Sequence, residues 1–165
     1  MPSLASIAEI CGPPPWTTTG RMPAGLQAHP WREDRLLVAV PTDADHPAPD
    51  AFKPSDIDET RLLMLEDGHC LTEHALAACN RPDLRAEAQM LGTSLHTVVQ
   101  MVDNGLGMTM LPEMALNAGI LEHTRVEARP LDAPHASRQV ALVWRRASPR
   151  ERDFRLLAGL LAESH

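Results

Sequence analysis

The chain has 165 residues, of which 44% are hydrophobic and 22% are charged. These proportions are ordinary for a globular protein that is long enough to bury a core. The formal net charge is −7 and only 3% of the residues are aromatic, with no tyrosine. Both properties argue against nucleic-acid binding through a basic surface or stacked bases. No apolar run approaches the roughly 20 residues of a membrane span, and no signal peptide is evident. We therefore expect a cytoplasmic protein with no membrane partner.

The first 30 residues differ in character from the rest of the chain. A proline tract (Pro13–Pro15) and a threonine tract (Thr17–Thr19) interrupt any hydrophobic period. We expect an irregular segment over residues 1–30, followed by one folded domain over residues 31–165.

Within that domain, strands and helices are predicted in alternation. Short apolar runs predict strands at residues 36–40, 62–65, 108–111, 126–131 and 140–144. Helical patterns follow several of these runs, at residues 71–79, 93–105, 113–118 and from 148 onward. Strands that alternate with helices indicate an α/β fold built on a largely parallel sheet.

Two of the helices have clear boundaries. The first takes Thr93 or Ser94 as its N-cap, stops at Gly105, and carries an apolar stripe of Leu95, Val98, Val99 and Val102. The last begins with a serine and a proline in the capping positions, Ser148 and Pro149. Its predicted buried face consists of Phe154, Leu157, Ala158 and Leu161.

Two cysteines flank the first predicted helix. Cys70 follows the Glu66–Gly68 break, at a strand-to-helix junction where helix amides stabilise a thiolate. Cys79 lies nine positions later, which in a continuous helix is about 13 Å of rise and half a turn of net rotation. A disulfide requires Cα atoms within about 7 Å of each other. A disulfide between them therefore requires the helix to unwind. We hypothesise that oxidation of this pair changes the fold and acts as a redox switch.

Two other interpretations of the cysteines remain open at this point. Cys70 can be a buried structural thiol. Alternatively, His69, His74, Cys70 and Cys79 can form a zinc site, although adjacent side chains diverge and Cys79 would join only with distortion. We predict no metal and no cofactor. Cys11 is interpreted as a leftover thiol.

Three further motifs carry a family resemblance: Gly68–Cys70 with its second cysteine, Gly92–Leu95, and the Gly105–Pro112 segment Gly-Leu-Gly-Met-Thr-Met-Leu-Pro. Together they resemble the regulatory domain of the OxyR family, the hydrogen-peroxide-sensing members of the LysR-type transcription regulators. The resemblance runs from about Trp31 to the C-terminus.

The resemblance implies roles for individual residues. Cys70 is the peroxide-reactive cysteine, Cys79 resolves it to an intramolecular disulfide, and His69 orients the thiolate. Thr93 and Ser94 match positions that line the effector cleft in LysR-type domains. Hydrogen peroxide is the implied effector, and a homodimer is the implied assembly.

The resemblance also implies a fold, a periplasmic-binding-protein-like effector domain, of which this chain holds only part. Residues 38–135 would form one complete lobe, and residues 136–165 would return to an incomplete second lobe. No match is found to the helix-turn-helix domain through which this family binds DNA. An incomplete lobe exposes apolar surface and strand edges, which favours dimerisation.

The function predicted from the sequence is a redox-sensing regulatory domain of a transcription regulator rather than an enzyme. One alternative is a thiol peroxidase, but no Pro-x-x-x-Thr/Ser-x-x-Cys motif precedes Cys70. The other is a gene fragment without function.

Overall fold

The computed structural model describes residues 6–9, 24–43, 47–65, 71, 76, 90–134 and 136–163. The chain divides into two compact units. The central unit is residues 35–137, and the terminal unit combines residues 1–34 with residues 138–165. No helix in the described ranges is long and apolar enough to cross a membrane.

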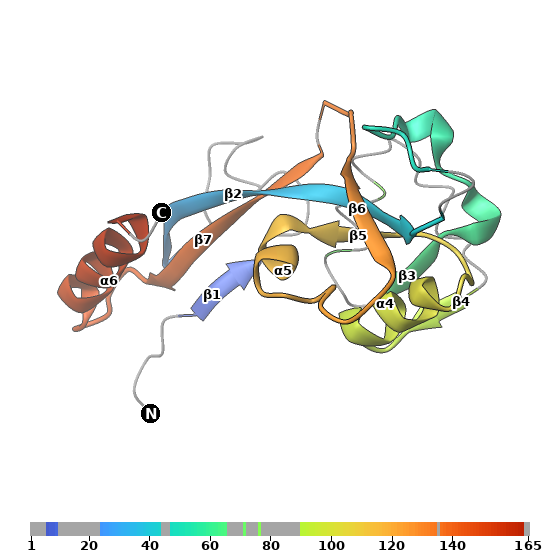
Figure 1. The fold of residues 1–165 in the computed structure, drawn as a ribbon. Helices are drawn as coiled ribbons and strands as arrows, with labels where there is room; N and C mark the ends of the chain where they lie inside the picture. The colour runs from blue at the N-terminus through green and yellow to red at the C-terminus, as the bar shows by residue number, and fades with distance from the viewer. Residues whose placement is uncertain are drawn as a thin grey trace. The chain divides into compact units, whose positions relative to one another are not determined.

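The central unit contains the carboxyl half of a long strand and most of the short elements (Figure 1). In chain order these are β2 (Leu26–Pro41), η1 (Pro54–Asp56), η2 (Glu59–Arg61), β3 (Leu63–Leu65), β4 (Met90–Gly92), α4 (Leu95–Asp103), β5 (Thr109–Pro112), α5 (Glu113–Asn117) and β6 (Val126–Pro130). Strand β2 pairs antiparallel with β5 and β6, whereas β3 pairs parallel with β4. An isolated parallel bridge joins Leu62 to Met108.

The expectation of a largely parallel sheet is therefore wrong for β2 and right for β3 and β4. A continuous apolar run such as residues 36–40 reports that both faces of a strand are buried, and does not report the direction of its neighbours. The predicted strands themselves are present, with β2 extending well beyond its apolar part.

Helix α4 supplies the centre of the core in this unit. Its stripe residues Val98, Val99 and Val102 are at most 1% exposed, and the helix contacts β3, β4 and β5 (Figure 1). Ser94 is the N-cap, since its hydroxyl accepts from the Thr97 amide at 3.2 Å. Gly105 ends the helix with φ +76. The predicted helix and its boundaries are confirmed.

Gly107 lets the loop before β5 lie against the chain before β3. A Cβ built on Gly107 would lie 2.0 Å from the carbonyl oxygen of Arg61. The same backbone segments exchange two hydrogen bonds: Met108 N–H donates to Arg61 at 2.9 Å, and Leu63 N–H donates to Met108 at 2.8 Å.

The terminal unit consists of β1 (Ser6–Glu9), the amino half of β2, β7 (Ser137–Arg145) and α6 (Glu151–Glu163). Strand β7 lies between β1 and β2, and it pairs antiparallel with β1. The small core of this unit is a cluster of Leu142, Trp144, Phe154 and Ala158. Trp31 also holds α6 in place, because its indole N–H donates a hydrogen bond to the Leu161 carbonyl at 2.9 Å.

Two sequence predictions fail in the terminal unit. Residues 6–9 form β1 and β2 starts at Leu26, so the segment 1–30 is not irregular throughout; residues 10–23 lie outside the described residues. Phe154 and Ala158 of α6 are buried as expected, but Leu157 is 41% exposed. Helix α6 carries leucines on two faces, and the sequence pattern alone does not select the one that packs.

A buried ion pair joins β2 to β7 inside the terminal unit. The Arg138 guanidinium donates through Nε and Nη2 to one Asp34 carboxylate oxygen, each at 2.8 Å. The Asp34 side chain is 0% exposed and the Arg138 side chain is 5% exposed. They occupy the last residue before the chain leaves this unit and the first residue after it returns.

We expect Asp34→Asn to destabilise the protein by about 3–5 kcal/mol, because the substitution leaves the buried Arg138 charge uncompensated. Urea unfolding followed by circular dichroism measures the loss. The exposed Arg150–Asp153 pair is the matched control, and Asp153→Asn should change stability by less than about 1 kcal/mol. Equal effects of the two substitutions would contradict the role given to the buried pair.

We expect Gly107→Ala to be much more destabilising than Gly105→Ala. The first places a methyl group on the Arg61 carbonyl, whereas a Cβ at Gly105 meets nothing within 4 Å and carries only the strain of its positive φ, about 1–2 kcal/mol. Thermal unfolding of the two variants compares them directly. A Gly107→Ala variant as stable as Gly105→Ala would show that the loop can move away from Arg61 at little cost.

Candidate functional site

The three predicted redox residues, His69, Cys70 and Cys79, lie outside the described residues. Their predicted roles are therefore argued from the residues that flank them. Strand β3 ends at Leu65 before this segment, and β4 begins at Met90 after it. Within the segment, Leu71 and Leu76 are described.

Leu71 and Leu76 anchor this segment to the core of the central unit. Both are helical, and they are 7% and 6% exposed. Both belong to the same hydrophobic cluster as β3 and α4. The residue that directly follows Cys70 is thus held in the core by its side chain. Neither leucine was predicted as part of the site, because an apolar residue in a helical pattern indicates burial without indicating its neighbours.

A small cavity lies against Leu71. Its volume is about 20 Å³, and it is lined by β3, Leu95, Thr109 and Met110 together with Leu71. The Thr109 hydroxyl in this lining already donates a hydrogen bond to the Leu63 carbonyl at 2.8 Å. The space is about that of one water molecule, and the described part of its lining is apolar except for Thr109.

Thr93 and Ser94 form the turn between β4 and α4. Thr93 is exposed and Ser94 is half-buried. The Ser94 hydroxyl accepts from the Thr97 amide and lies 3.0 Å from the Thr97 hydroxyl. Gly92 sets the turn against α4, because a Cβ there would lie 2.4 Å from Val98 Cγ2. The two predicted effector-site residues are neighbours at the amino end of α4, with Ser94 also serving as its cap.

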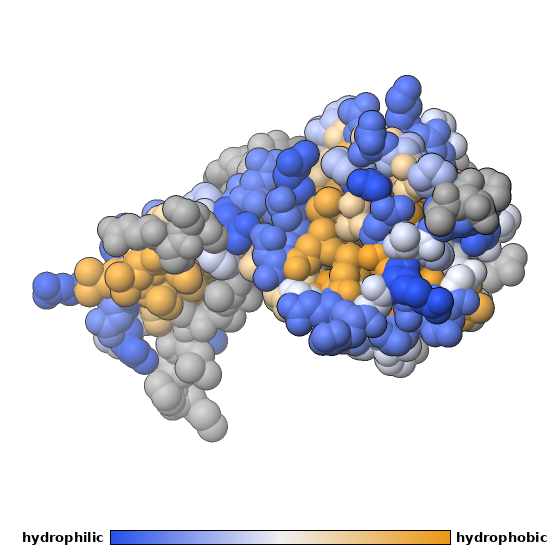
Figure 2. All heavy atoms as spheres, in the orientation of Figure 1, coloured by the Kyte–Doolittle hydropathy of each residue, from blue (hydrophilic) through white to orange (hydrophobic). Residues whose placement is uncertain are grey.

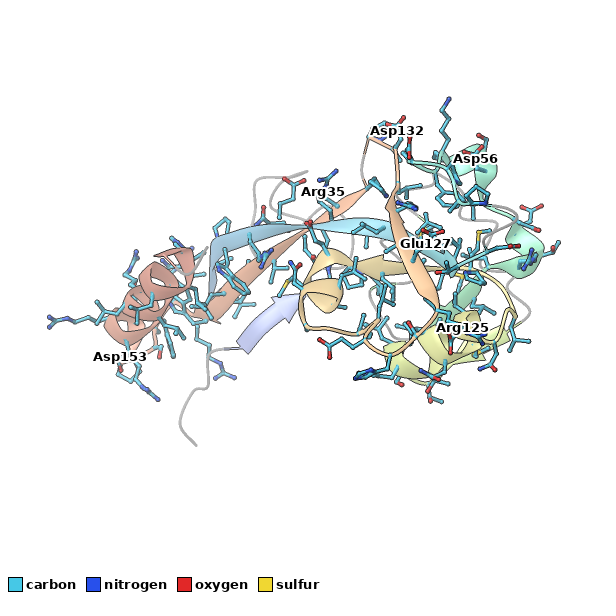
Figure 3. All side chains as sticks on the ribbon, in the orientation of Figure 1. Arg35, Asp56, Arg125, Glu127, Asp132 and Asp153 are labelled. Carbon is cyan, nitrogen blue, oxygen red and sulfur yellow. The ribbon has the colours of Figure 1, made fainter. Side chains whose placement is uncertain are left out.

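The other end of α4 is also fixed. Asp103 accepts a hydrogen bond from the Arg125 amide at 2.7 Å. Figure 3 shows Arg125 beside α4, where β6 begins. The Arg125 guanidinium lies 3.9 Å from the Asp103 carboxylate and offsets a negative charge at the negative end of the helix dipole. With a cap at each end, the turn that carries Thr93 and Ser94 has a rigid support.

A larger groove lies elsewhere on the central unit. Its volume is about 300 Å³, and its lining includes the loop after β2, Phe52, Arg61 and Met108. Near it, Asp58 caps η2 and accepts a 2.7 Å hydrogen bond from the Thr60 hydroxyl. This hydrogen bond lowers the pKa of the Asp58 carboxyl. Within the described ranges, no group of three or more His, Cys, Asp or Glu side chains could hold a metal ion.

Comparison with known proteins identifies the family. The model of the LysR substrate binding domain matches residues 10–165. The chain belongs to this family. The match extends over residues of both units.

The curated relatives are transcription regulators. The chain is 33% identical over 141 residues to a probable hydrogen peroxide-inducible genes activator of Mycobacterium avium, covering 85% of this chain and 45% of the relative. It is 34% identical over 131 residues to the regulator EstR of Acinetobacter baylyi, covering 76% of this chain and 42% of the relative. The LysR-type domain described here thus spans less than half the length of these relatives.

The similar solved structures include OxyR regulatory domains and a full-length OxyR. The reduced form of the OxyR2 regulatory domain from Vibrio vulnificus has a TM-score of 0.74 and 33% identity, covering 87% of this chain and 67% of that one. A full-length OxyR variant from Pseudomonas aeruginosa has a TM-score of 0.73 and 30% identity, covering 85% of this chain and 51% of that one. The predicted periplasmic-binding-protein-like α/β class is confirmed.

Proposed function

We propose that this chain is the redox-sensing regulatory domain of a peroxide-responsive LysR-type transcription regulator. The observation that supports it most directly is the Cys70–Cys79 spacing inside a domain similar to those of peroxide-inducible activators. EstR is a comparably similar relative, so the family alone does not select peroxide as the effector. The Cys70–Cys79 pair is the feature of this chain that favours peroxide as the effector.

The proposed chemistry uses two electrons from two thiols. The Cys70 thiolate attacks one oxygen of hydrogen peroxide, the O–O bond breaks, and protonation of the leaving hydroxide gives water and a sulfenic acid. The Cys79 thiol then attacks that sulfur, the S–O bond breaks, and a second water leaves with formation of the disulfide. His69 orients the Cys70 thiolate.

The switch arises from the conflict between the disulfide and the buried leucines. Residues 70 and 79 approach within about 7 Å only if the helix between them unwinds. Leu71 and Leu76, which are buried in the described structure, lie within that stretch. Oxidation therefore pulls core side chains out of the central unit, and the energy of the disulfide is used to change the structure of the domain.

We propose the remaining roles by analogy with the family. Thr93 and Ser94 line the effector site at the amino end of α4. DNA is bound through a separate helix-turn-helix domain of the complete regulator, the regulatory domain forms a homodimer, and the protein works in the cytoplasm. We propose a regulatory switch rather than an enzyme, in which the disulfide persists without continuous turnover of peroxide.

We expect stoichiometric hydrogen peroxide to form a Cys70–Cys79 disulfide. Mass spectrometry of the intact chain should show the loss of two hydrogens, and peptide mapping should place the bond between these two residues. Cys79→Ser should stop at the sulfenic acid, which a dimedone adduct traps. Cys11→Ser is the control and should behave as the unmodified chain does.

Two results would reject the proposal or change it. Free thiols at both positions after treatment would exclude the sensor. Sustained peroxide consumption in the presence of a thiol reductant would instead favour a thiol peroxidase that uses the same cysteines.

We expect Leu76→Ala to favour the disulfide. Truncation of a buried leucine costs a reduced domain about 2–5 kcal/mol, and the oxidised domain does not bear that cost because the side chain has already left the core. If the reduced domain loses about 2 kcal/mol of stability, the reduction potential of the Cys70–Cys79 disulfide becomes more negative by about 40 mV. Equilibration with glutathione buffers measures this shift.

Val126→Ala is the matched control for that measurement. Val126 is 8% exposed and lies in β6, outside the redox segment, so its truncation should weaken both redox states equally. A reduction potential that moves as much in Val126→Ala as in Leu76→Ala would contradict the proposed coupling.

A further inference from the structure

Helix α4 is followed by an asparagine and a glycine. Asn104 and Gly105 are both exposed, and in Figure 2 the visible surface over α4 is mostly hydrophilic, so water reaches this part of the domain. An asparagine before a glycine is chemically labile, because the glycine has no side chain to hinder attack by its backbone nitrogen on the preceding carboxamide. The end of α4 therefore carries a candidate modification site.

The modification needs no reactant other than water. The Gly105 backbone nitrogen attacks Cγ of Asn104 and forms a C–N bond. The carboxamide nitrogen leaves as ammonia and takes up the proton that the Gly105 amide loses. Water then opens the succinimide ring at either of its carbonyl groups. The products are aspartate and isoaspartate, both with a new negative charge, and no electrons are transferred.

Both reacting groups are held in hydrogen bonds in the folded domain. The Asn104 side-chain amide donates to the Gln100 carbonyl at 2.7 Å, and the Gly105 N–H donates to the Val102 carbonyl at 2.8 Å. The first bond holds the carboxamide back along the helix. The second engages the proton that the nitrogen must lose before it can attack.

The backbone conformation adds to this protection. Ring closure requires the Gly105 nitrogen to swing toward Asn104 Cβ, by roughly a third of a turn about the Cα–C bond from the observed ψ of 9°. That rotation also breaks the 3.1 Å hydrogen bond from the Leu106 N–H to the Met101 carbonyl. Attack therefore requires the last turn of α4 to open, as helix ends do locally and reversibly.

We propose that Asn104 is a site of spontaneous deamidation, which the carboxyl end of α4 protects while it is folded and exposes when it frays. The change weakens the turn that protected the site. An aspartate has no N–H to donate to the Gln100 carbonyl, and its charge lies beside Asp103 at the negative end of the helix dipole. This inference is independent of the cysteine chemistry.

The first test compares the native chain with the chain unfolded in guanidinium chloride. Peptide mapping by mass spectrometry follows deamidation at neutral pH. We expect Asn104 to react at least about tenfold more slowly in the native chain. Asn117 is the internal control, because the side chain of Ala118 after it hinders attack, and it should react more slowly than Asn104 in the unfolded chain. Equal rates for Asn104 in the two conditions would overturn the protection, and no reaction in the unfolded chain would overturn the site.

Asp103→Ala tests whether opening of this helix end is the gate. The substitution removes the 2.7 Å hydrogen bond from the Arg125 amide and leaves Asn104 and Gly105 unchanged. Loss of a bond to a charged acceptor outweighs the relief of a negative charge at this end of the helix. We expect faster deamidation in the native variant and an unchanged rate in guanidinium chloride. An unchanged native rate, or an equal rise in both conditions, would contradict the gate.

Amide hydrogen exchange at Gly105 gives a second measurement, on the unmodified chain. Exchange and deamidation both require the Gly105 N–H to leave the Val102 carbonyl, so folding should slow both by comparable factors. Circular dichroism checks that Asp103→Ala is folded. Should it not fold, the exchange measurement decides the question. A Gly105 amide that exchanges as fast as in the unfolded chain, while Asn104 stays protected, would overturn the gate.

Discussion

The burial of Leu71 and Leu76 is the constraint on which the proposed switch depends. Each leucine joins the hydrophobic cluster that contains β3 and α4, and each lies in the stretch between the two cysteines. In the proposed switch, a Cys70–Cys79 disulfide requires the chain between the cysteines to unwind, which conflicts with a core that contains both leucines. Hydrophobic packing of the two leucines stabilises the proposed reduced state. Formation of the disulfide can shift the domain to the other state if its free energy exceeds that of the packing.

The sequence predicts best where several local signals agree. For α4, the N-cap, the apolar stripe and the terminating glycine all indicate the same helix, and that helix is observed. It predicts worst where the outcome depends on distant partners. The apolar run in β2 does not specify the direction of its neighbours, and Leu157 is one of several leucines that could have faced the core. The Asp34–Arg138 pair joins residues 104 positions apart, and neither residue carries a local signal of the other.

The candidate site shows the same division. Cys70 and Cys79 were found because their spacing has a geometric consequence that can be worked out without coordinates. Thr93 and Ser94 came from the resemblance, and the structure adds that Ser94 already serves α4 as its cap. The leucine anchors and the Thr109 hydroxyl bond to Leu63 emerged only from packing, because an apolar or hydroxyl side chain in a sequence does not show what it will touch.

The Asp34–Arg138 pair also has a consequence for the order in which the chain folds during synthesis. Residues 35–137 are contiguous, so the ribosome releases the whole central unit before Arg138 appears. The Asp34 carboxylate, which will become fully buried, must then stay in water until Arg138 and the residues of β7 have emerged. Domains fold as units from the amino end during translation. The ion pair therefore forms only after the whole central unit has emerged.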